Sequence, residues 1–253
     1  MHGSTRCRKV FRSLRVAPLV IPQLLTTTLD FPPIETALTE PNGLLAFGGD
    51  LSAERLIQAY QLGIFPWYDA SQPILWWSPH PRAVLFPKNL KISKSLMKTL
   101  KKGVFNVTYD KAFEQVIQHC QAPRKYAEGT WITEEMQKAY IELHRRQYAH
   151  SIECWQEGRL VGGLYGVTLG KLFFGESMFS LVTDSSKVAF VYLVKHLESF
   201  QYPLIDCQVG NSHLESLGTS FIDRQTFKNY LIQNQQYSLD LTHWQTPFQF
   251  SFD

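Results

Sequence analysis

Alternating apolar and polar residues between 151 and 174 form three short segments. The pairs Glu157-Gly158 and Leu169-Gly170, which separate the segments, are typical of tight turns. A helical pattern follows from Thr183, and residues 204–209 then form a further short apolar run. Because no tight turn precedes this last run, the order predicts an antiparallel meander, a helical crossover and a mixed sheet.

Helical spacing of apolar residues predicts four helices before the meander and another near the end of the chain. The first four begin at or near Ser52, Lys91, Asp110 and Thr133, and Asp223 precedes the last. Ser, Asp and Thr side chains favour the position just before a helix, because they accept hydrogen bonds from its first turn. Helices combined with a mixed sheet place the chain in the α+β class.

The segment between Asp69 and Asp110 contains no acidic residue. Its lysines include four that are spaced three or four apart, and this spacing places them on one helical face: Lys91, Lys94, Lys98 and Lys101. A solvated face normally mixes Glu with Lys, because like charges repel at this spacing. We therefore interpret the face, together with Arg82 and Lys102, as a surface for nucleic-acid phosphates. An ordinary solvated face is the alternative.

Composition narrows the class of protein. The 253 residues are 44% hydrophobic and 19% charged with a net charge of +3, which excludes a disordered chain. The four cysteines and eight histidines lack metal-binding spacing, so we expect free thiols in a reducing compartment and no metal site. No apolar run is long enough to cross a membrane. Residues 1–29 contain Arg and Lys but no Asp or Glu, so we expect them to be a basic extension rather than a signal peptide.

Three carboxylate or amide side chains lie in apolar surroundings. Asp206 and Gln208 are two residues apart, so a regular strand would project both from one face. Burying such groups is costly unless they hydrogen-bond each other or a ligand. The pair is therefore a candidate ligand-binding site, and a purely structural hydrogen bond is the alternative interpretation. Glu176 stands among phenylalanines and likewise needs a partner, which is either an ion pair or an amine-bearing substrate.

Six motifs are similar to those of the bacterial leucyl/phenylalanyl-tRNA–protein transferases, in the same order. They are PNGLLAFGGDL at 41–51, GIFPW at 63–67, WWSP at 76–79, GTWIT at 129–133, GESMFS at 175–180 and IDCQ at 205–208. The resemblance extends from about residue 31 to about residue 231, and residues 1–19 have no counterpart. After the basic extension (1–29), it implies a small N-terminal domain (30–80) and an N-acetyltransferase-like, mixed-sheet C-terminal domain (81–253).

The resemblance also implies an activity. Such enzymes move Leu or Phe, and more weakly Met, from tRNA to the N-terminal Arg or Lys of acceptor proteins and so mark them for degradation by the N-end rule. It implies a cytoplasmic enzyme, which we expect to be a monomer, with no cofactor beyond the aminoacyl-tRNA substrate. The N-acetyltransferases mark their acetyl-CoA site with Arg/Gln-x-x-Gly-x-Gly/Ala, whereas 181–186 reads LVTDSS.

By position, Asp206 and Gln208 match the catalytic pair of the family. The residues that match the pocket for the transferred side chain are Leu164, Phe173, Glu176, Phe190, Leu193, Leu197 and Ile205. Those that match the surroundings of the terminal adenosine are Trp67, Trp131 and Tyr140. Phe190 and Leu193 fall in a variable part of the pocket for the transferred side chain.

The implied mechanism needs little covalent chemistry, because the aminoacyl ester is already activated. We expect Asp206 to hold Gln208, whose carbonyl would accept a hydrogen bond from the incoming amine and aim its lone pair at the ester. The residues leave open whether Asp206 or a ribose hydroxyl takes the proton. Two alternatives stand beside this reading: a transferase of the same fold that builds a cell-wall peptide, and a non-catalytic RNA-binding module.

Overall fold

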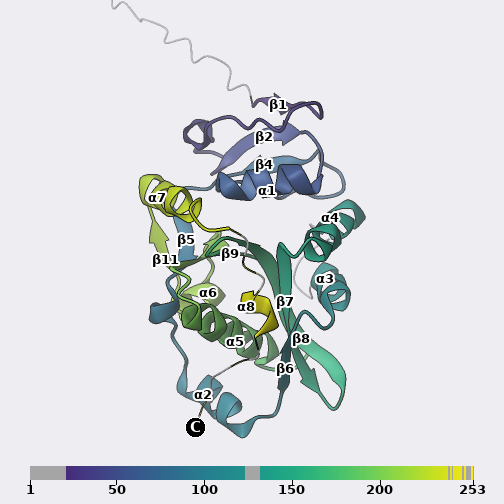
Figure 1. Cartoon of the computed structure of the whole chain (residues 1–253), viewed down its shortest axis with the longest axis vertical. Helices are drawn as coiled ribbons and strands as arrows, with labels where there is room; N and C mark the ends of the chain where they lie inside the picture. Colours follow the sequence, from purple (N-terminus) through teal and green to yellow (C-terminus); the bar gives the residue numbers. More distant parts are fainter. Residues whose placement is uncertain are drawn as a thin grey trace, which may run out of the picture.

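The chain folds into two sheets with helices around them (Figure 1). The computed structural model describes residues 21–122 and 132–238, together with 240, 242–246, 248 and 252. Within these residues the smaller sheet has the strand order β1-β2-β4-β3, and the larger has the order β11-β5-β10-β9-β8-β7-β6. No helix in the described ranges is long and apolar enough to cross a membrane.

The smaller sheet belongs to the first part of the chain. Helix α1 (Ala53–Gln61) lies between it and the larger sheet (Figure 1), and Ser52 caps this helix as predicted. Arg55 on α1 is fully buried and donates hydrogen bonds to Leu25 O and Thr28 O, which ties the segment that follows β1 to the helix. The other elements here are β1 (Gln23–Leu24), η1 (Ile34–Thr36), β2 (Leu44–Gly48), β3 (Phe65–Pro66) and β4 (Leu75–Trp77).

The larger sheet contains the predicted meander, formed by β7 (Ala149–Gln156), β8 (Arg159–Leu169) and β9 (Leu172–Ser180). Helix α5 (Ser185–Ser199) then crosses to β10 (Leu204–Gln208), which is parallel to β9. This confirms the predicted α+β class and the mixed sheet of the C-terminal part. The pattern does not predict the remaining strands, which are too short to show a period: β5 (Arg82–Leu85), β6 (Asn106–Tyr109) and β11 (Ser220–Ile222).

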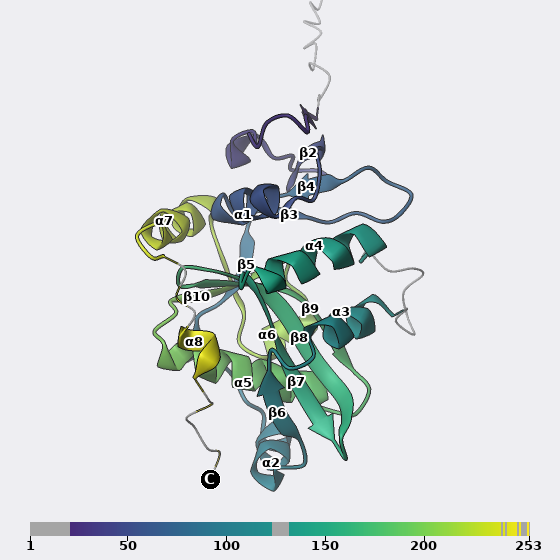
Figure 2. The same ribbon diagram turned by 45° about the vertical axis from the view of Figure 1, so that its right-hand side comes forward.

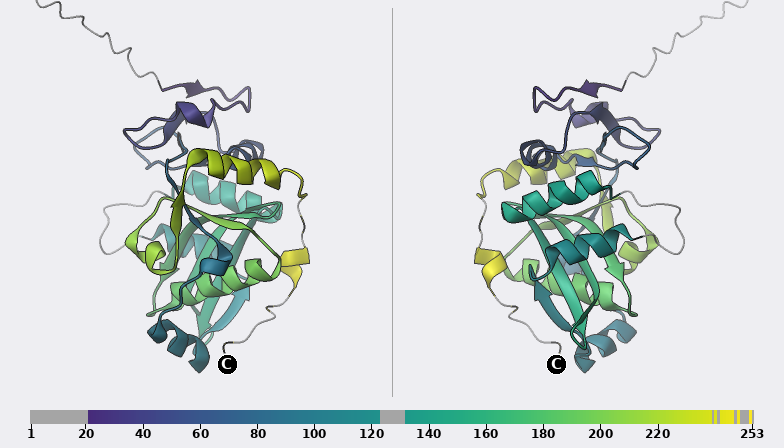
Figure 3. Two further views of the ribbon diagram at one scale, coloured as in Figure 1. Left: turned by 90° about the vertical axis from the view of Figure 1, so that its left-hand side faces the viewer. Right: turned by 90° about the vertical axis from the view of Figure 1, so that its right-hand side faces the viewer.

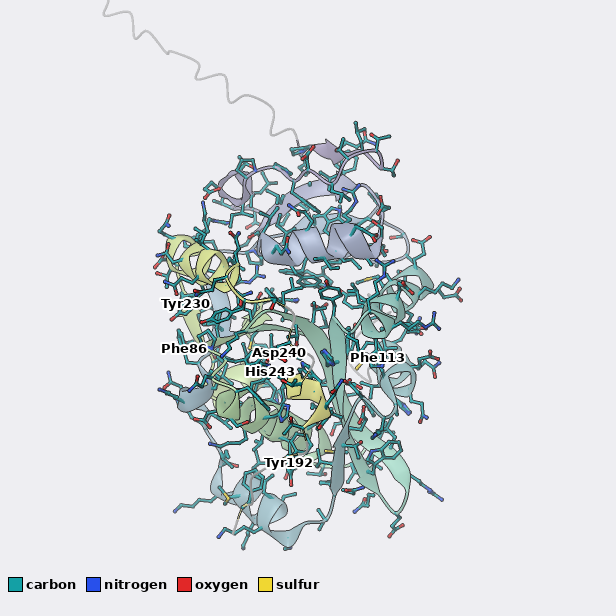
Figure 4. The ribbon with its side chains drawn as sticks, viewed as in Figure 1. Phe86, Phe113, Tyr192, Tyr230, Asp240 and His243 are labelled. Carbon is teal, nitrogen blue, oxygen red and sulfur yellow. The ribbon has the colours of Figure 1, made fainter. Side chains whose placement is uncertain are left out.

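Helices cover both faces of the larger sheet. The two opposite views in Figure 3 show α5 on one side and α3 (Phe113–Gln121) and α4 (Glu134–Arg145) on the other. Figure 4 marks Phe113 on α3 and Tyr192 on α5, which pack in two different hydrophobic clusters. The remaining helices are η2 (Pro87–Asn89), α2 (Lys94–Lys102), α6 (Ser212–Ser216), α7 (Arg224–Asn234) and α8 (Thr242–Gln245).

Two local predictions are corrected by the structure. Asp110 does not cap α3: its carboxylate instead accepts hydrogen bonds from Ser151 N and from the ring of His150. Lys91 lies before α2, because Ser93 is the residue that caps this helix. The predicted caps at Thr133 and Asp223 are confirmed. The domain boundaries after residues 29 and 80 stay a prediction.

Candidate active site

The candidate site lies where β9 and β10 stop pairing. Their parallel register ends at Asp206, which is opposite Phe174, and β9 then continues to Ser180. At the same point β10 carries a bulge against β5, and Gln208 has a left-handed backbone with φ of 60°. The end of the pairing brings Asp206, Gln208 and Glu176 together from two strands.

The bulge changes the predicted relation between Asp206 and Gln208. In a regular strand both side chains would share a face, but the register slips between them because two β10 steps oppose a single step of β5. The residues do contact each other, through the main chain: Gln208 N donates to Asp206 Oδ1 at 2.9 Å. Their side chains take different partners, since Asp206 bonds Arg82 and Gln208 bonds Glu176.

Asp206 forms a buried ion pair with Arg82. Arg82 Nε lies 2.8 Å from Oδ1 and Nη2 lies 2.7 Å from Oδ2, with side-chain exposures of 2% and 0% for the two residues. Arg82 Cζ also lies over the rings of Phe65 and Phe227, at 4.9 and 4.7 Å from their centroids. The prediction that Arg82 belongs to an exposed tRNA-binding surface is therefore wrong, because strand β5 buries its side chain.

Glu176 has only uncharged partners among the described residues. Its Oε1 accepts hydrogen bonds from Tyr60 OH and from Gln208 Nε2, both at 2.7 Å. Its Oε2 accepts one from Tyr140 OH at 2.9 Å, and the two tyrosine hydroxyls lie 2.5 Å apart. The predicted need for a partner is thus met by two phenols and an amide, and not by an ion pair.

Burial raises the pKa of Glu176 to about 7, although the hydrogen bonds from Tyr60, Tyr140 and Gln208 oppose this shift. The residue as a whole keeps some exposure, but protein atoms enclose its carboxylate. Burial also raises the pKa of Tyr60 and of Tyr140 well above the usual range, so both hydroxyls keep their protons and can donate. Glu176 can therefore change its charge near neutral pH while its donors cannot.

Tyr60 is a site residue that the sequence did not indicate. It lies on the apolar side of α1, in the first part of the chain, and its spacing is that of an ordinary core residue. Tyr140, which the family resemblance did indicate, comes from α4. Only the tertiary structure shows that α1 and α4 bring both hydroxyls to Glu176.

Six of the residues predicted for the apolar pocket lie in one buried cluster, whereas the two tyrosine partners of Glu176 lie in another. The apolar members are all buried and belong to one cluster against α5: Leu164, Phe173, Phe190, Leu193, Leu197 and Ile205. Tyr60 and Tyr140, the partners of Glu176, belong to the cluster that includes Phe174. Because side chains alternate along β9, Phe173 and Phe174 face the two clusters. The apolar residues of the predicted pocket and the hydroxyl partners of Glu176 therefore lie on different sides of β9.

The residues predicted near the tRNA adenosine differ in their exposure. Trp67 is 44% exposed, and its ring lies against that of Trp77 with centroids 5.6 Å apart. Tyr140 is fully buried. Trp131 lies outside the described residues. Trp67 therefore keeps a surface on which a base could stack.

The predicted lysine surface lies on α2 and just before it. Leu96 and Leu100 are buried, while all five lysines are exposed: Lys91, Lys94, Lys98, Lys101 and Lys102. Figure 2 shows α2 at the end of the molecule opposite the smaller sheet. In the ranges that the structure describes, no three His, Cys, Asp or Glu side chains could together hold a metal ion.

Comparison with known proteins identifies relatives along most of the chain. The family model described as leucyl/phenylalanyl-tRNA protein transferase matches residues 84–232, and the model for the N-terminal domain of the same family matches 49–80. The leucyl/phenylalanyl-tRNA–protein transferase of Pseudomonas fluorescens (strain Pf0-1) is 59% identical over 211 residues, which cover 83% of this chain and 93% of the relative.

A second relative with the same description, from Azotobacter vinelandii, is 60% identical over 207 residues, which cover 82% of this chain and 92% of the relative. Among solved structures, that of L-PGS from Bacillus licheniformis matches 74% of this chain and 59% of its own. Its TM-score of 0.36 and 13% identity are too low to support a conclusion.

Proposed function

This chain belongs to the leucyl/phenylalanyl-tRNA–protein transferase family, and we propose that it moves Leu or Phe, and Met more weakly, from aminoacyl-tRNA to the N-terminal Arg or Lys of acceptor proteins. The general reaction, aminoacyl transfer from tRNA to a protein, is the one for which its relatives are named. We place the reaction in the cytoplasm, where its product would be marked for degradation. No cofactor takes part, because the aminoacyl ester is itself the activated group.

The observation that best supports this function is the way in which Gln208 is held. Its side-chain Nε2 donates to Glu176 and its main-chain N–H donates to Asp206, so both the side chain and the main chain of Gln208 are held in place. No donor among the described residues occupies its Oε1. This oxygen is therefore left to accept a hydrogen bond from the incoming α-amine, as the mechanism requires.

The reaction then proceeds by direct attack. The neutral amine, held by Gln208 Oε1, directs its lone pair to the ester carbonyl carbon. The new C–N bond forms as the bond to the ribose oxygen breaks, and the amine proton ends on that ribose oxygen. Positioning alone can supply several kcal/mol of the rate enhancement, on the order of that found for oriented reactants.

Selectivity for the amino acid would come from the apolar side chains packed against α5. Ile and Val carry their branch at Cβ, next to the main chain, and are stiff at χ1, whereas Leu branches one carbon further out and Phe places its ring beyond Cβ. Val is also one methylene smaller than Leu, a difference that an apolar pocket discriminates about 10- to 200-fold. We therefore expect Ile and Val to be transferred poorly.

The experiment that tests this function is transfer of radiolabelled Leu from charged tRNA to a peptide with an N-terminal Lys or Arg. Wild type is compared with Gln208→Ala, and with Gln225→Ala as a matched control, since Gln225 is an exposed glutamine on α7. We expect transfer by wild type and by Gln225→Ala, and a large loss in Gln208→Ala. An acetylated peptide should accept nothing, because its α-amine is blocked.

Two results would contradict the proposal. If wild type binds charged tRNA but transfers nothing, the chain is a tRNA-binding module. If Gln208→Ala transfers at the wild-type rate, the reaction is present but the role of Gln208 is misassigned.

A further inference from the structure

We propose that Arg82 is a positioning residue for the transfer reaction: through Asp206 it fixes the main chain at Gln208 and so aims the amide of Gln208 at the reacting groups. The inference rests on the proposed function and adds a residue to its machinery. It also gives Asp206 a different task from accepting a proton.

The carboxylate of Asp206 is already occupied. Its Oδ1 accepts hydrogen bonds from Arg82 Nε and from Gln208 N, and its Oδ2 accepts one from Arg82 Nη2. A carboxylate offers about four acceptor positions, so only one remains free. The residue has no exposed surface through which substrate or water could reach that position. Asp206 is therefore built to hold its neighbours in place.

What Asp206 holds is an unfavourable backbone conformation. Gln208 has φ of 60°, in the left-handed region that residues with a Cβ seldom adopt. The hydrogen bond from Gln208 N back to the Asp206 carboxylate, two residues earlier, stabilises this turn. If the carboxylate moved, the main chain at Gln208 could relax and its amide would turn away from Glu176.

Arg82 in turn fixes the carboxylate. Its planar guanidinium makes two parallel hydrogen bonds, a geometry that a lysine ammonium cannot reproduce. The rings of Phe65 from β3 and Phe227 from α7 both contact it. Strand β5, the smaller sheet and α7 thus set the orientation of Asp206, and through it that of Gln208.

A double-mutant cycle tests this chain of contacts, with Arg82→Gln, Asp206→Asn and the double variant. The double variant leaves no buried charge unpaired, so it can fold even if Arg82→Gln does not. We expect each variant to lower kcat on the order of 100-fold, as for misplaced reacting groups, with KM for aminoacyl-tRNA and its salt dependence unchanged. The double variant should be no slower than the slower single one, because the two residues act as a unit.

Arg55→Gln is the matched control. Arg55 is an equally buried arginine, but it holds the main chain of the segment 25–28 and does not contact Gln208. We expect it to lower the melting temperature without changing kcat per folded molecule. A purely structural role for Arg82 would give the same pattern as Arg55→Gln, or a wild-type kcat in the double variant, and either result would overturn the inference.

Hydrogen exchange at the Gln208 amide gives a readout that does not depend on transfer. We expect the double variant to lose protection there while amides in the meander keep theirs. Unchanged protection at Gln208 would overturn the inference. If wild type transfers nothing, the proposed function fails by itself, and this exchange measurement still decides whether Arg82 and Asp206 hold the Gln208 main chain.

Discussion

Gln208 is held between two carboxylates that have opposite surroundings. Asp206 faces a guanidinium and has no exposed surface, whereas Glu176 faces two phenols and an amide and has no cation among the described residues. A buried charge with a cationic partner is compensated, while one with neutral donors is compensated only in part. The first side of the site is thus a fixed anchor, and the second can gain or lose a proton near neutral pH.

The largest difference should appear when each carboxylate is removed. Asp206→Ala leaves the buried Arg82 unpaired, and we expect a loss of about 3–5 kcal/mol in the free energy of unfolding together with loss of transfer. Urea denaturation at pH 7 measures the first effect. A loss below about 1 kcal/mol would show that Arg82 finds another partner, and the two sides of the site would then be less distinct.

Glu176→Gln should change stability in the other direction. The pKa of Glu176 is raised from 4.5 to about 7 on folding, so the folded state holds a proton that the unfolded state loses between these values. Wild-type stability therefore falls as pH rises from 4.5 to 7, and above pH 7 this cost is on the order of 3 kcal/mol. We expect Glu176→Gln to be more stable than wild type at pH 8 and equal to it near pH 4.

The same titration predicts the pH dependence of transfer. Ionised Glu176 accepts the Nε2–H of Gln208, whereas the protonated acid can donate to Gln208 Oε1 once the amide rotates, and it then occupies the oxygen that the amine needs. Wild-type kcat should therefore fall as the pH drops below about 7. An identical fall in Glu176→Gln would assign the titration to another group, such as the substrate amine.

Tyr60→Phe and Tyr140→Phe should have smaller effects. Each removes a hydrogen bond that lowers the pKa of Glu176, so the pKa should rise further. We expect the midpoint of the pH profile to move upward by about one unit, as for one hydrogen bond to a charged group. Tyr68→Phe is the control, because Tyr68 OH contacts Thr133 and not Glu176. A downward move would mean that the phenols stabilise the neutral acid.

Substituting one of the exposed lysines on α2 should have the smallest effect on the free energy of unfolding. Lys98→Gln should leave the free energy of unfolding within about 0.5 kcal/mol of wild type, as for other surface substitutions. If Lys98 contacts a tRNA phosphate, the slope of log K against log salt should decrease by about 1. Lys228→Gln on α7, where the lysine pairs with Glu35, is the matched control. Equal slopes for both variants would favour the solvated-face interpretation.

Much of the fold could be predicted from local patterns. The meander, the crossover helix and β10 follow from periods of 2 and 3.6, and the caps at Ser52, Thr133 and Asp223 follow from residue type. Short strands such as β5 could not be predicted, because four residues show no period. Arg82 therefore looked like a member of the basic surface, although β5 places it in the core.

The sequence by itself determined the family, the mixed sheet and the presence of Asp206, Gln208 and Glu176, because motifs and periods are local properties of the chain. The tertiary structure alone decided how these residues are joined. The bulge in β10 separates the side chains of Asp206 and Gln208, and contacts between distant segments give each carboxylate its partners. The charge and orientation of a buried group depend on what surrounds it in space, which no single stretch of sequence specifies.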